Sequence, residues 1–232
     1  MERKISVDWD QARASLDSRG FVRIPSVLPE KQCLDICDLY QEETLFRSTI
    51  NMQRYRFGMG EYKYFGYPLP ALIQSLREEF FEPLVPLANE WMNRLGVDTR
   101  YPSRLPEFLS LCHSKGQKRP TPLVLRYEGG GYNTLHQDIY GEIFFPFQVV
   151  FILTQPGRDY EGGELVFVEQ LPRAQSRAEV VIPQQGDAVI FTTNFRPVKG
   201  SKGYYRAKMK HGVSPVKQGL RYTMGIIFHD AS

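Results

Sequence analysis

Residues 122–140 of this 232-residue chain read PLVLRYEGGGYNTLHQDIY, an apolar run followed by three glycines and a His-Gln-Asp triplet. The run from Leu123 to Tyr127 predicts a strand, and the glycines predict a tight turn. The chain that leaves this turn carries His136 and Asp138. Because residues two apart in an extended strand point to the same face, this imidazole and this carboxylate can hold one metal ion.

A third ligand and a cationic neighbour lie far downstream. His211 would add a second imidazole to His136 and Asp138. A set of two histidines and one carboxylate leaves coordination positions open and suits non-haem Fe(II) used for oxygen chemistry. Arg221 then offers a planar fork for a carboxylate near the metal.

Three residues fit the binding of a dicarboxylic 2-oxo acid at such a centre. The 2-oxo group and its adjacent carboxylate would chelate iron, while the far carboxylate would reach Arg221. Thr223 lies two residues after Arg221, so both side chains point to one face of the last long predicted strand. Tyr127, at the end of the strand before the glycines, offers a phenolic hydrogen bond to the same ligand.

The segments beyond Pro122 predict a β-rich core. Short runs rich in Val, Ile, Phe and Tyr are separated by Gly, Pro, Asp and Asn, which indicates a sandwich or barrel. The runs are PLVLRYE, FQVVFILT, ELVFVE, AEVVIP, DAVIFTT and RYTMGIIFHD.

The first 95 or so residues are mainly helical in pattern. Asp8 caps a predicted helix that runs to about Arg19, a short strand FVRIPSVL follows, and Pro29 opens a second helix. Residues 70–96 predict one or two amphipathic helices, interrupted around Pro83 and Pro86. We therefore expect an α+β fold, a double-stranded β-helix (jelly roll) with packed N-terminal helices. Residues 1–232 would form a single domain, with 1–95 as the helical support and 96–232 as the catalytic jelly roll.

Composition excludes several classes of protein. The chain is 42% hydrophobic with a formal charge of +3, and neither a secretory signal nor a membrane span is apparent. Three cysteines cannot form a fully paired disulfide framework, which fits a cytoplasmic protein. Cys33, Ile36, Cys37 and Tyr40 follow helical spacing, so we interpret the two cysteines as part of a packed helix face rather than a metal or redox site.

Two basic segments bear on the substrate. Residues 54–67 interleave basic and aromatic residues, and residues 196–210 carry six basic residues immediately before His211. The six are Arg196, Lys199, Lys202, Arg206, Lys208 and Lys210. This composition suits a single strand or a flipped base, but it would equally suit an acidic protein, a small anion or plain solvent. We expect the second segment to overhang the site as a lid.

The order of these features resembles the Fe(II)/2-oxoglutarate dioxygenases, nearest to the prolyl-hydroxylase branch. The resemblance covers roughly residues 123–230, nearly half of the chain. The whole chain is also similar to a bacterial group described as oxygenases that oxidatively demethylate damaged DNA. The features that carry the resemblance are, in chain order, Tyr127, the glycine turn, HQD, EGGEL (Glu161–Leu165), Gly186-Asp187, His211 and RYT (Arg221–Thr223).

The resemblance implies roles for these positions. His136, Asp138 and His211 become the Fe(II) ligands, and Arg221 becomes the 2-oxoglutarate binder with help from Tyr127 and Thr223. Dioxygen is the second co-substrate. The final strand, RYTMGIIFHDAS, lacks the second arginine that is typical of alkylated-DNA repair enzymes, and it is closer to the prolyl-hydroxylase pattern.

Four functions are consistent with the sequence. The leading hypothesis is an Fe(II)- and 2-oxoglutarate-dependent dioxygenase that hydroxylates a C–H bond and releases succinate and CO2, acting on alkylated nucleic-acid bases. A hydroxylase of protein side chains is the alternative within the same chemistry. A non-catalytic metal-binding jelly roll that acts as a sensor, and a zinc hydrolase that uses the same ligands, are the alternatives outside it.

Overall fold

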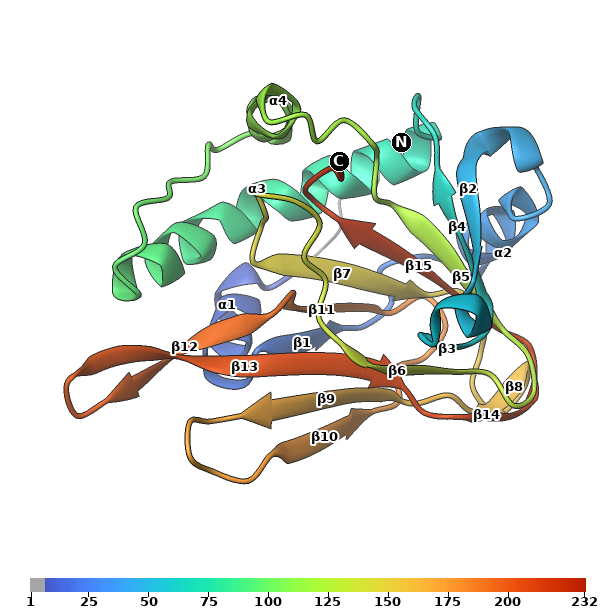
Figure 1. Cartoon of the computed structure of the whole chain (residues 1–232). Helices are drawn as coiled ribbons and strands as arrows, with labels where there is room; N and C mark the ends of the chain where they lie inside the picture. Colours follow the sequence, from blue (N-terminus) through green and yellow to red (C-terminus); the bar gives the residue numbers. More distant parts are fainter. Residues whose placement is uncertain (1–6) are drawn as a thin grey trace.

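The computed structural model describes residues 7–232 and shows two antiparallel sheets, with helices on the outer side of one of them (Figure 1). The helices are α1 (Trp9–Arg19), α2 (Glu30–Leu39), α3 (Ala71–Arg94) and α4 (Leu105–Ser114), with short 3-10 turns η1 (Glu43–Leu45) and η2 (Met52–Tyr55). This arrangement confirms the predicted α+β class, with a jelly-roll core and N-terminal helices.

The larger sheet has seven strands and the smaller sheet has six. In spatial order the larger sheet contains β1 (Phe21–Ile24), β11 (Ala188–Thr192), β7 (Phe147–Ile152), β15 (Arg221–Ile227), β5 (Leu123–Tyr127), β4 (Glu61–Phe65) and β2 (Phe46–Asn51). The smaller sheet contains β10 (Arg177–Val181), β9 (Leu165–Gln170), β13 (Gly203–Val213), β6 (Tyr132–His136) and β3 (Gly58–Met59), and β12 (Phe195–Gly200) pairs with β13. A separate pair joins β8 (Tyr160–Gly162) to β14 (Val216–Gly219).

Strand β7 shows how the sequence FQVVFI builds two cores at once. Phe151 faces the helices, where its ring centroid lies 5.3 Å from that of Phe80 in α3. Val150 and Ile152 face the second sheet and belong to a separate apolar cluster. A strand that is covered on both sides needs apolar residues at every position, so Gln148 stands out as the one polar residue of this strand.

Helix α1 follows its sequence signals. The Asp8 side chain accepts a hydrogen bond from the backbone N–H of Gln11, and Gly20 ends the helix in the left-handed conformation that glycine adopts without a steric penalty. The following strand, β1, and helix α2 also lie where they were predicted. Cys33 is fully buried on α2, which agrees with the interpretation of this face as packing.

Helix α3 departs from the prediction, because it continues through Pro83 and Pro86 as one element. An internal proline costs a helix about 3 kcal/mol. Eleven side chains of α3 are buried, including Phe80 and Trp91, and this packing outweighs the local penalty. Among the helices of residues 7–232, none combines the length and the apolar content needed to cross a bilayer.

The N-terminal region also supplies strands to both edges of the larger sheet. β1 pairs with β11 at one edge, and β4 pairs with β5 toward the other. Tyr62 of β4 lies opposite Leu125 of β5. This pairing places Tyr62 and Tyr64 beside the cavity between the two sheets. The region expected to be mainly helical is therefore part of the jelly roll itself.

A buried ion pair fixes the end of the chain. Asp230 and Arg77 are both completely buried, with 2.8 Å between Arg77 Nη2 and Asp230 Oδ1. The other carboxylate oxygen accepts a hydrogen bond from the Tyr67 hydroxyl at 2.9 Å and lies 2.9 Å from His113 Nε2. One carboxylate thus joins α3, α4 and the segment after β15.

Replacing Asp230 by alanine should lower the free energy of unfolding by about 3–5 kcal/mol, because the buried charge of Arg77 would lose its carboxylate partner. Urea denaturation followed by circular dichroism measures this change. Asp35→Ala is the matched control, since Asp35 forms an exposed pair with Lys31, and we expect a change of at most about 0.5 kcal/mol. Equal effects of the two substitutions would contradict a structural role for the buried pair.

Candidate active site

The three predicted metal ligands converge in the space between the sheets. His136 is the last residue of β6, and its Cα is paired with that of His211 across the ladder to β13. Asp138 lies beyond the end of β6, where its backbone N–H donates to the carbonyl of Thr193 at 3.1 Å. The prediction that one strand presents both ligands is therefore wrong for Asp138. His136 belongs to β6, whereas Asp138 lies beyond it and is held by Thr193, which follows β11 of the larger sheet.

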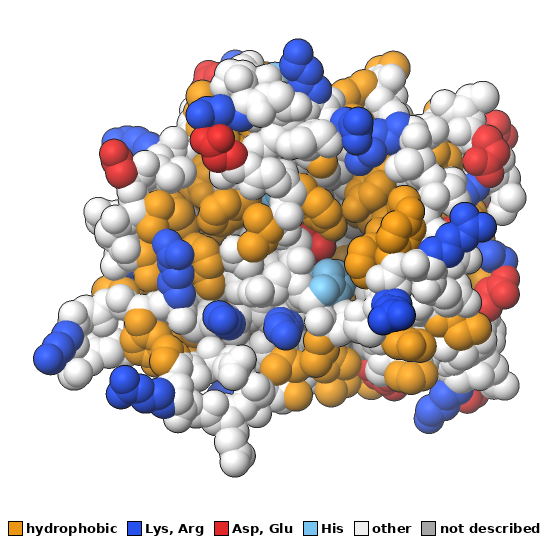
Figure 2. All heavy atoms as spheres, viewed as in Figure 1, with side chains coloured by type: hydrophobic (Ala, Val, Ile, Leu, Met, Phe, Trp, Pro, Cys, Tyr) orange, Lys and Arg blue, Asp and Glu red, His pale blue; other side chains and the backbone are white. Residues whose placement is uncertain are grey.

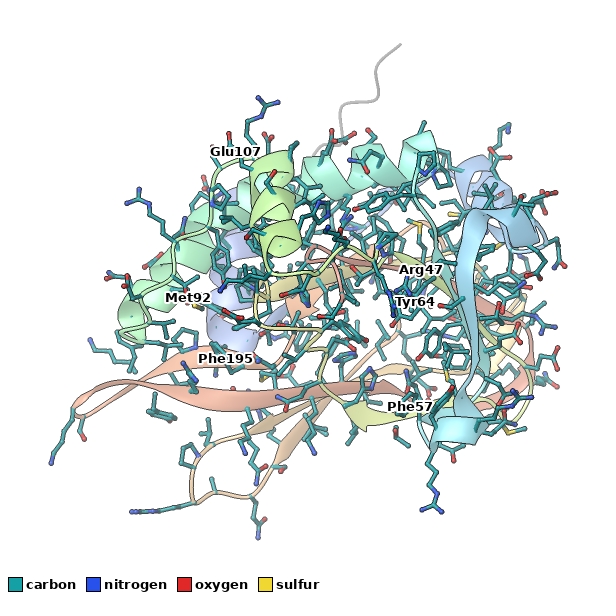
Figure 3. All side chains as sticks on the ribbon, turned by 45° about the horizontal axis from the view of Figure 1, so that its top comes forward. Arg47, Phe57, Tyr64, Met92, Glu107 and Phe195 are labelled. Carbon is teal, nitrogen blue, oxygen red and sulfur yellow. The ribbon has the colours of Figure 1, made fainter. Side chains whose placement is uncertain are left out.

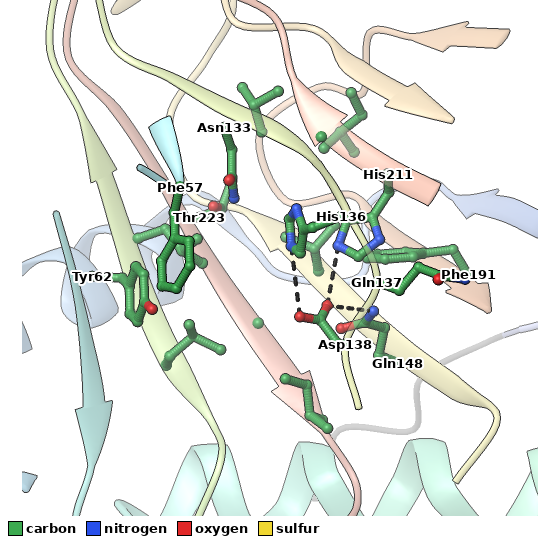
Figure 4. A pocket seen from close by; sticks show the side chains of 18 of the residues that line it. Phe57, Tyr62, Asn133, His136, Gln137, Asp138, Gln148, Phe191, His211 and Thr223 are labelled. Atoms are coloured by element: carbon green, nitrogen blue, oxygen red, sulfur yellow. Dashed lines mark hydrogen bonds and ion pairs between the residues drawn. The ribbon is translucent and has the colours of Figure 1, made fainter. Parts of the chain in front are cut away.

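The distances within this cluster suit one cation. One ligand atom from each of His136, Asp138 and His211 lies within 4.8 Å of the other two. Nε2 of His211 is 3.1 Å from Asp138 Oδ2, and Nε2 of His136 is 3.6 Å from Asp138 Oδ1 (Figure 4). Nδ1 of His136 lies 2.7 Å from the carbonyl oxygen of Thr134, an outer contact that orients the ring and leaves Nε2 for the metal.

The electrostatics keep these groups in the protonation states that bind metals. Burial, followed by the charge of His211, lowers the pKa of His136, which favours the neutral imidazole. Burial alone would raise the pKa of Asp138, but attraction and a hydrogen bond from His211 and the charge of His136 bring it below its ordinary value. At neutral pH the cluster therefore offers a carboxylate and an unprotonated imidazole at His136.

Two residues that the sequence interpretation missed hold the Asp138 carboxylate. Gln148 Nε2 donates to Asp138 Oδ2, and the Tyr140 hydroxyl donates to Asp138 Oδ1, each at 2.8 Å. Both had a signal in the sequence. Gln148 is the polar exception in FQVVFI, and Tyr140 lies two residues after Asp138. Such outer contacts fix the orientation of a ligating carboxylate.

Gln117 holds the segment that carries these groups, and no local pattern revealed it. Its amide nitrogen donates to the carbonyls of Tyr140, Ile143 and Asp230 at 3.0, 2.8 and 2.7 Å. Its amide oxygen accepts from the Ile143 N–H at 2.8 Å. One buried amide therefore ties the loop after Asp138 to the end of the chain.

Removing the hydroxyl of Tyr140 with Tyr140→Phe should weaken the affinity for a divalent metal by about 10- to 100-fold, as is typical for the loss of an outer contact to a ligand. Calorimetric titration with Mn(II) under anaerobic conditions measures this affinity. Tyr101→Phe is the control, because the buried Tyr101 hydroxyl has no hydrogen-bond partner among residues 7–232. Unchanged affinity in Tyr140→Phe would show that Asp138 is oriented without it.

The predicted carboxylate binders line the same cavity as the ligand cluster. Arg221 is the first residue of β15 and Thr223 the third, and Tyr127 ends the adjacent strand β5, directly opposite Arg221 in the ladder. The Arg221 side chain is among the largest that are fully buried, and its Nε and Nη1 have no hydrogen-bond partner among the described residues. Burial raises the pKa of Tyr127 to about 12, so its hydroxyl remains a proton donor at neutral pH.

The cavity has a volume of about 270 Å³ and its walls are mostly aromatic and aliphatic. His136, Asp138 and His211 lie at one side, while Phe57 and Tyr62 form the opposite side (Figure 4). Tyr64 also lines the cavity, and Arg47 lies over its ring at 4.6 Å from the centroid (Figure 3). The residues present fit a divalent cation at the cluster. They also fit an anionic group at Arg221, because an anion would offset the cost of burying a guanidinium that has no ion pair among the described residues.

The basic segment before His211 forms a hairpin of β12 and β13 rather than a loop. The two strands pair continuously from Phe195 with Lys208 to Gly200 with Gly203. This pairing straightens the segment, which extends beyond the other strands of its sheet (Figure 1). Among the described residues that line the cavity, none falls between positions 196 and 210, so a lid role for this segment stays a prediction.

Comparison with known proteins places this site in a family. A family model described as "Oxygenase, catalysing oxidative methylation of damaged DNA" matches residues 60–231, which include all six predicted site residues. The chain belongs to this oxygenase family. The oxygenase is also 45% identical over 168 residues to an uncharacterized protein of Mycobacterium tuberculosis, known from strains CDC 1551 and H37Rv, and the match covers 72% of each chain.

Solved structures share the fold of the oxygenase at low identity. A prolyl-4-hydroxylase of Pseudomonas putida is 12% identical with a TM-score of 0.55, covering 97% of the oxygenase and 99% of that chain. A 2OG-Fe(II) oxygenase family oxidoreductase of Burkholderia pseudomallei is 14% identical with a TM-score of 0.55, covering 100% and 95%. By its family match the protein is an oxygenase, and His136, Asp138 and His211 form a cluster that could hold a metal ion.

Proposed function

We propose that His136, Asp138 and His211 bind Fe(II), and that Arg221 binds the far carboxylate of 2-oxoglutarate with Thr223 and Tyr127. The substrate of the enzyme would be an alkylated base in nucleic acid. The observation that carries the co-substrate assignment is the buried Arg221 guanidinium, which faces the cavity of the metal cluster without a carboxylate partner among the described residues. Burial of such a charge without an ion pair is costly, and a bound carboxylate would offset that cost.

Each residue would have a defined task. The two imidazoles and the carboxylate occupy one side of the metal and leave positions open for the 2-oxo acid and dioxygen. Fe(II), when bound, supplies the oxygen chemistry that couples decarboxylation of 2-oxoglutarate to oxidation of a C–H bond. Tyr140 and Gln148 fix the Asp138 carboxylate, and the apolar walls exclude water from the reacting groups.

The balanced reaction explains how a methyl group would leave a base. One oxygen atom of dioxygen enters succinate as CO2 is released, and the other converts a C–H bond of the substrate to C–OH. A hydroxymethyl group on a ring nitrogen then breaks its C–N bond, so that formaldehyde leaves and the ring nitrogen keeps the hydroxyl proton. The description of the family supports a base as substrate, and the aromatic wall formed by Phe57 and Tyr62 suits a planar ring.

A coupled assay tests the proposal. The protein is incubated aerobically with Fe(II), 2-oxoglutarate and either N-methylated oligonucleotides, their unmodified counterparts or proline-containing peptides. We expect succinate and formaldehyde in equal amounts from a methylated oligonucleotide, and only background succinate from its unmodified counterpart. Succinate coupled to hydroxylation of a peptide would instead assign the enzyme to protein side chains.

The remaining alternatives predict different products. A non-catalytic sensor would release no succinate with any substrate. A zinc hydrolase would be active without dioxygen or 2-oxoglutarate, and metal analysis after anaerobic purification would then find zinc. The two Arg221 nitrogens that lack a hydrogen-bond partner among the described residues favour the oxygenase over the zinc hydrolase, since hydrolysis requires no anion at this position.

A further inference from the structure

The cavity is too small to enclose a large substrate together with the co-substrate. Its volume of about 270 Å³ is close to the lower end of the range of about 300–1,000 Å³ that is usual for ligand pockets. Part of this space adjoins the metal cluster and Arg221, where the 2-oxo acid would lie. A single base or side chain can enter the remainder, so the chain that carries this group must bind outside, on the surface around the mouth.

An aromatic stack leads from the cavity wall to that surface. Phe57 lines the cavity and is nevertheless 46% exposed, and Tyr55, which is 56% exposed, stacks on it. Their ring centroids are 5.5 Å apart and their planes differ by 19°. Two parallel rings exposed at the mouth provide a platform on which successive bases can stack, whatever their sequence.

Exposed cations lie on the two sides of β6. Lys208 and Lys210 of β13 alternate with the buried residues Met209 and His211, so they point to the outer face of the smaller sheet. Arg54 and Arg56 belong to the turn that precedes β3. β13 and β3 pair with opposite edges of β6, which carries His136. None of the four cations forms an ion pair within residues 7–232. Figure 2 shows Lys and Arg side chains beside the hollow that contains a histidine, over β13 and toward η2.

The sequence around these cations is free of acidic residues. From position 188 to 229 there are eight Lys or Arg residues and no Asp or Glu, of which Arg221 is buried and Arg196 pairs with Glu169. From 44 to 60 there are three Arg residues and no acid. The net charge of the chain is only +3, so the positive charge is concentrated in these two segments. This distribution favours a polyanion as partner, and the exposed aromatic stack favours a polynucleotide over an acidic protein.

We propose that a single-stranded polynucleotide crosses the mouth of the cavity between these two groups of cations. Its phosphates contact Lys208 and Lys210 on one side and Arg54 and Arg56 on the other. One base stacks on Tyr55 while its neighbour enters the cavity past Phe57. This inference rests on the proposed function and extends it from the reacting base to the strand that carries it.

Binding of a fluorescent 12-nucleotide oligothymidylate to the full chain, with Fe(II) and 2-oxoglutarate under anaerobic conditions, tests the contacts. In Lys208→Gln/Lys210→Gln, the slope of log Kd against log salt should fall by roughly 1.4, because each phosphate contact to a single strand contributes about 0.7. Kd at low salt should rise on the order of tenfold. Tyr55→Ala should weaken binding about fivefold or more without a change in slope.

Matched variants separate this track from net charge. Lys31→Gln/Arg100→Gln removes the same charge from exposed positions on α2 and after α3, and it should leave both Kd and slope unchanged. Thermal denaturation verifies that each variant is folded. The proposal is overturned if the track variant and this control bind alike, or if a polyglutamate peptide of equal charge competes as well as an oligonucleotide.

Turnover distinguishes failure of this inference from failure of the proposed function. With a methylated 12-mer, the track variant should show a KM about tenfold higher than the wild type, whereas KM for a methylated mononucleotide should not change. Equal KM values for the 12-mer would overturn the track and leave the oxygenase function intact. If no methylated substrate is turned over, the proposed function fails, and the binding data alone then decide whether the surface holds a polynucleotide.

Discussion

Replacing Asp138 by asparagine should abolish succinate formation and reduce metal affinity by more than about 100-fold, beyond the range for the loss of an outer contact. The substitution keeps the size of the side chain but removes the only carboxylate of the cluster. The metal would then be held by two imidazoles, without the negative charge of Asp138 that neutralises part of the positive charge of the metal ion. Loss of His136 or His211 should have the same consequence, since each supplies one of three ligands.

Titration with Mn(II) and a succinate assay with saturating Fe(II) measure this prediction separately. Asp38→Asn provides the control, because Asp38 is an exposed carboxylate on α2. Its metal affinity and turnover should equal those of the wild type. Normal metal affinity in Asp138→Asn would mean that the centre lies elsewhere, and the assignment of all three ligands would then be wrong.

Replacing Arg221 by glutamine should raise the KM for 2-oxoglutarate by roughly 30-fold or more, because truncating one partner of a buried charge pair costs about 2–5 kcal/mol. Metal affinity should not change, since Arg221 is not part of the ligand cluster. The effect should depend on the far carboxylate of the co-substrate. A 2-oxo acid that lacks this carboxylate should bind the wild type and the variant equally weakly.

A stability measurement gives an independent test of the same residue. Without 2-oxoglutarate, the buried Arg221 guanidinium has unpaired donors among the described residues, so its replacement should leave the Tm of the protein unchanged or raise it. Addition of 2-oxoglutarate should stabilise the wild type and have much less effect on the variant. Arg126→Gln on β5 is the control, because Arg126 is partly exposed and pairs with Glu128. Equal stabilisation of all three proteins by 2-oxoglutarate would place its carboxylate elsewhere.

Much of the fold could be predicted because the signals are local. The capping side chain of Asp8 and the glycine at position 20 define α1 within three residues of each end. The apolar runs after Pro122 became β5, β7, β9, β10, β11 and β15. The continuity of α3 could not be predicted, because it depends on what Phe80 and Trp91 contact rather than on Pro83 and Pro86 themselves.

The candidate site was also predicted in part. The residue types and their spacing sufficed to select His136, Asp138, His211, Arg221, Thr223 and Tyr127, all of which line one cavity. The groups that hold Asp138 in place were missed. Gln148, on the following strand β7, contacts the carboxylate itself, and Gln117, which precedes β5, contacts the loop after Asp138. The course of residues 196–210 was also missed, because strand pairing with β13 decides it and the sequence shows only its charge.

The amino-acid sequence by itself indicated the candidate metal ligands and most secondary structure. The ligands could be selected by residue type, and helix caps and strand alternation are properties of neighbouring residues. Only the tertiary structure decided that Arg221 is buried without an ion pair among the described residues, that Asp138 is anchored by Thr193, and that exposed cations lie on the two sides of β6. These properties arise when separate strands are brought together, since burial and pairing depend on every group that packs around a side chain.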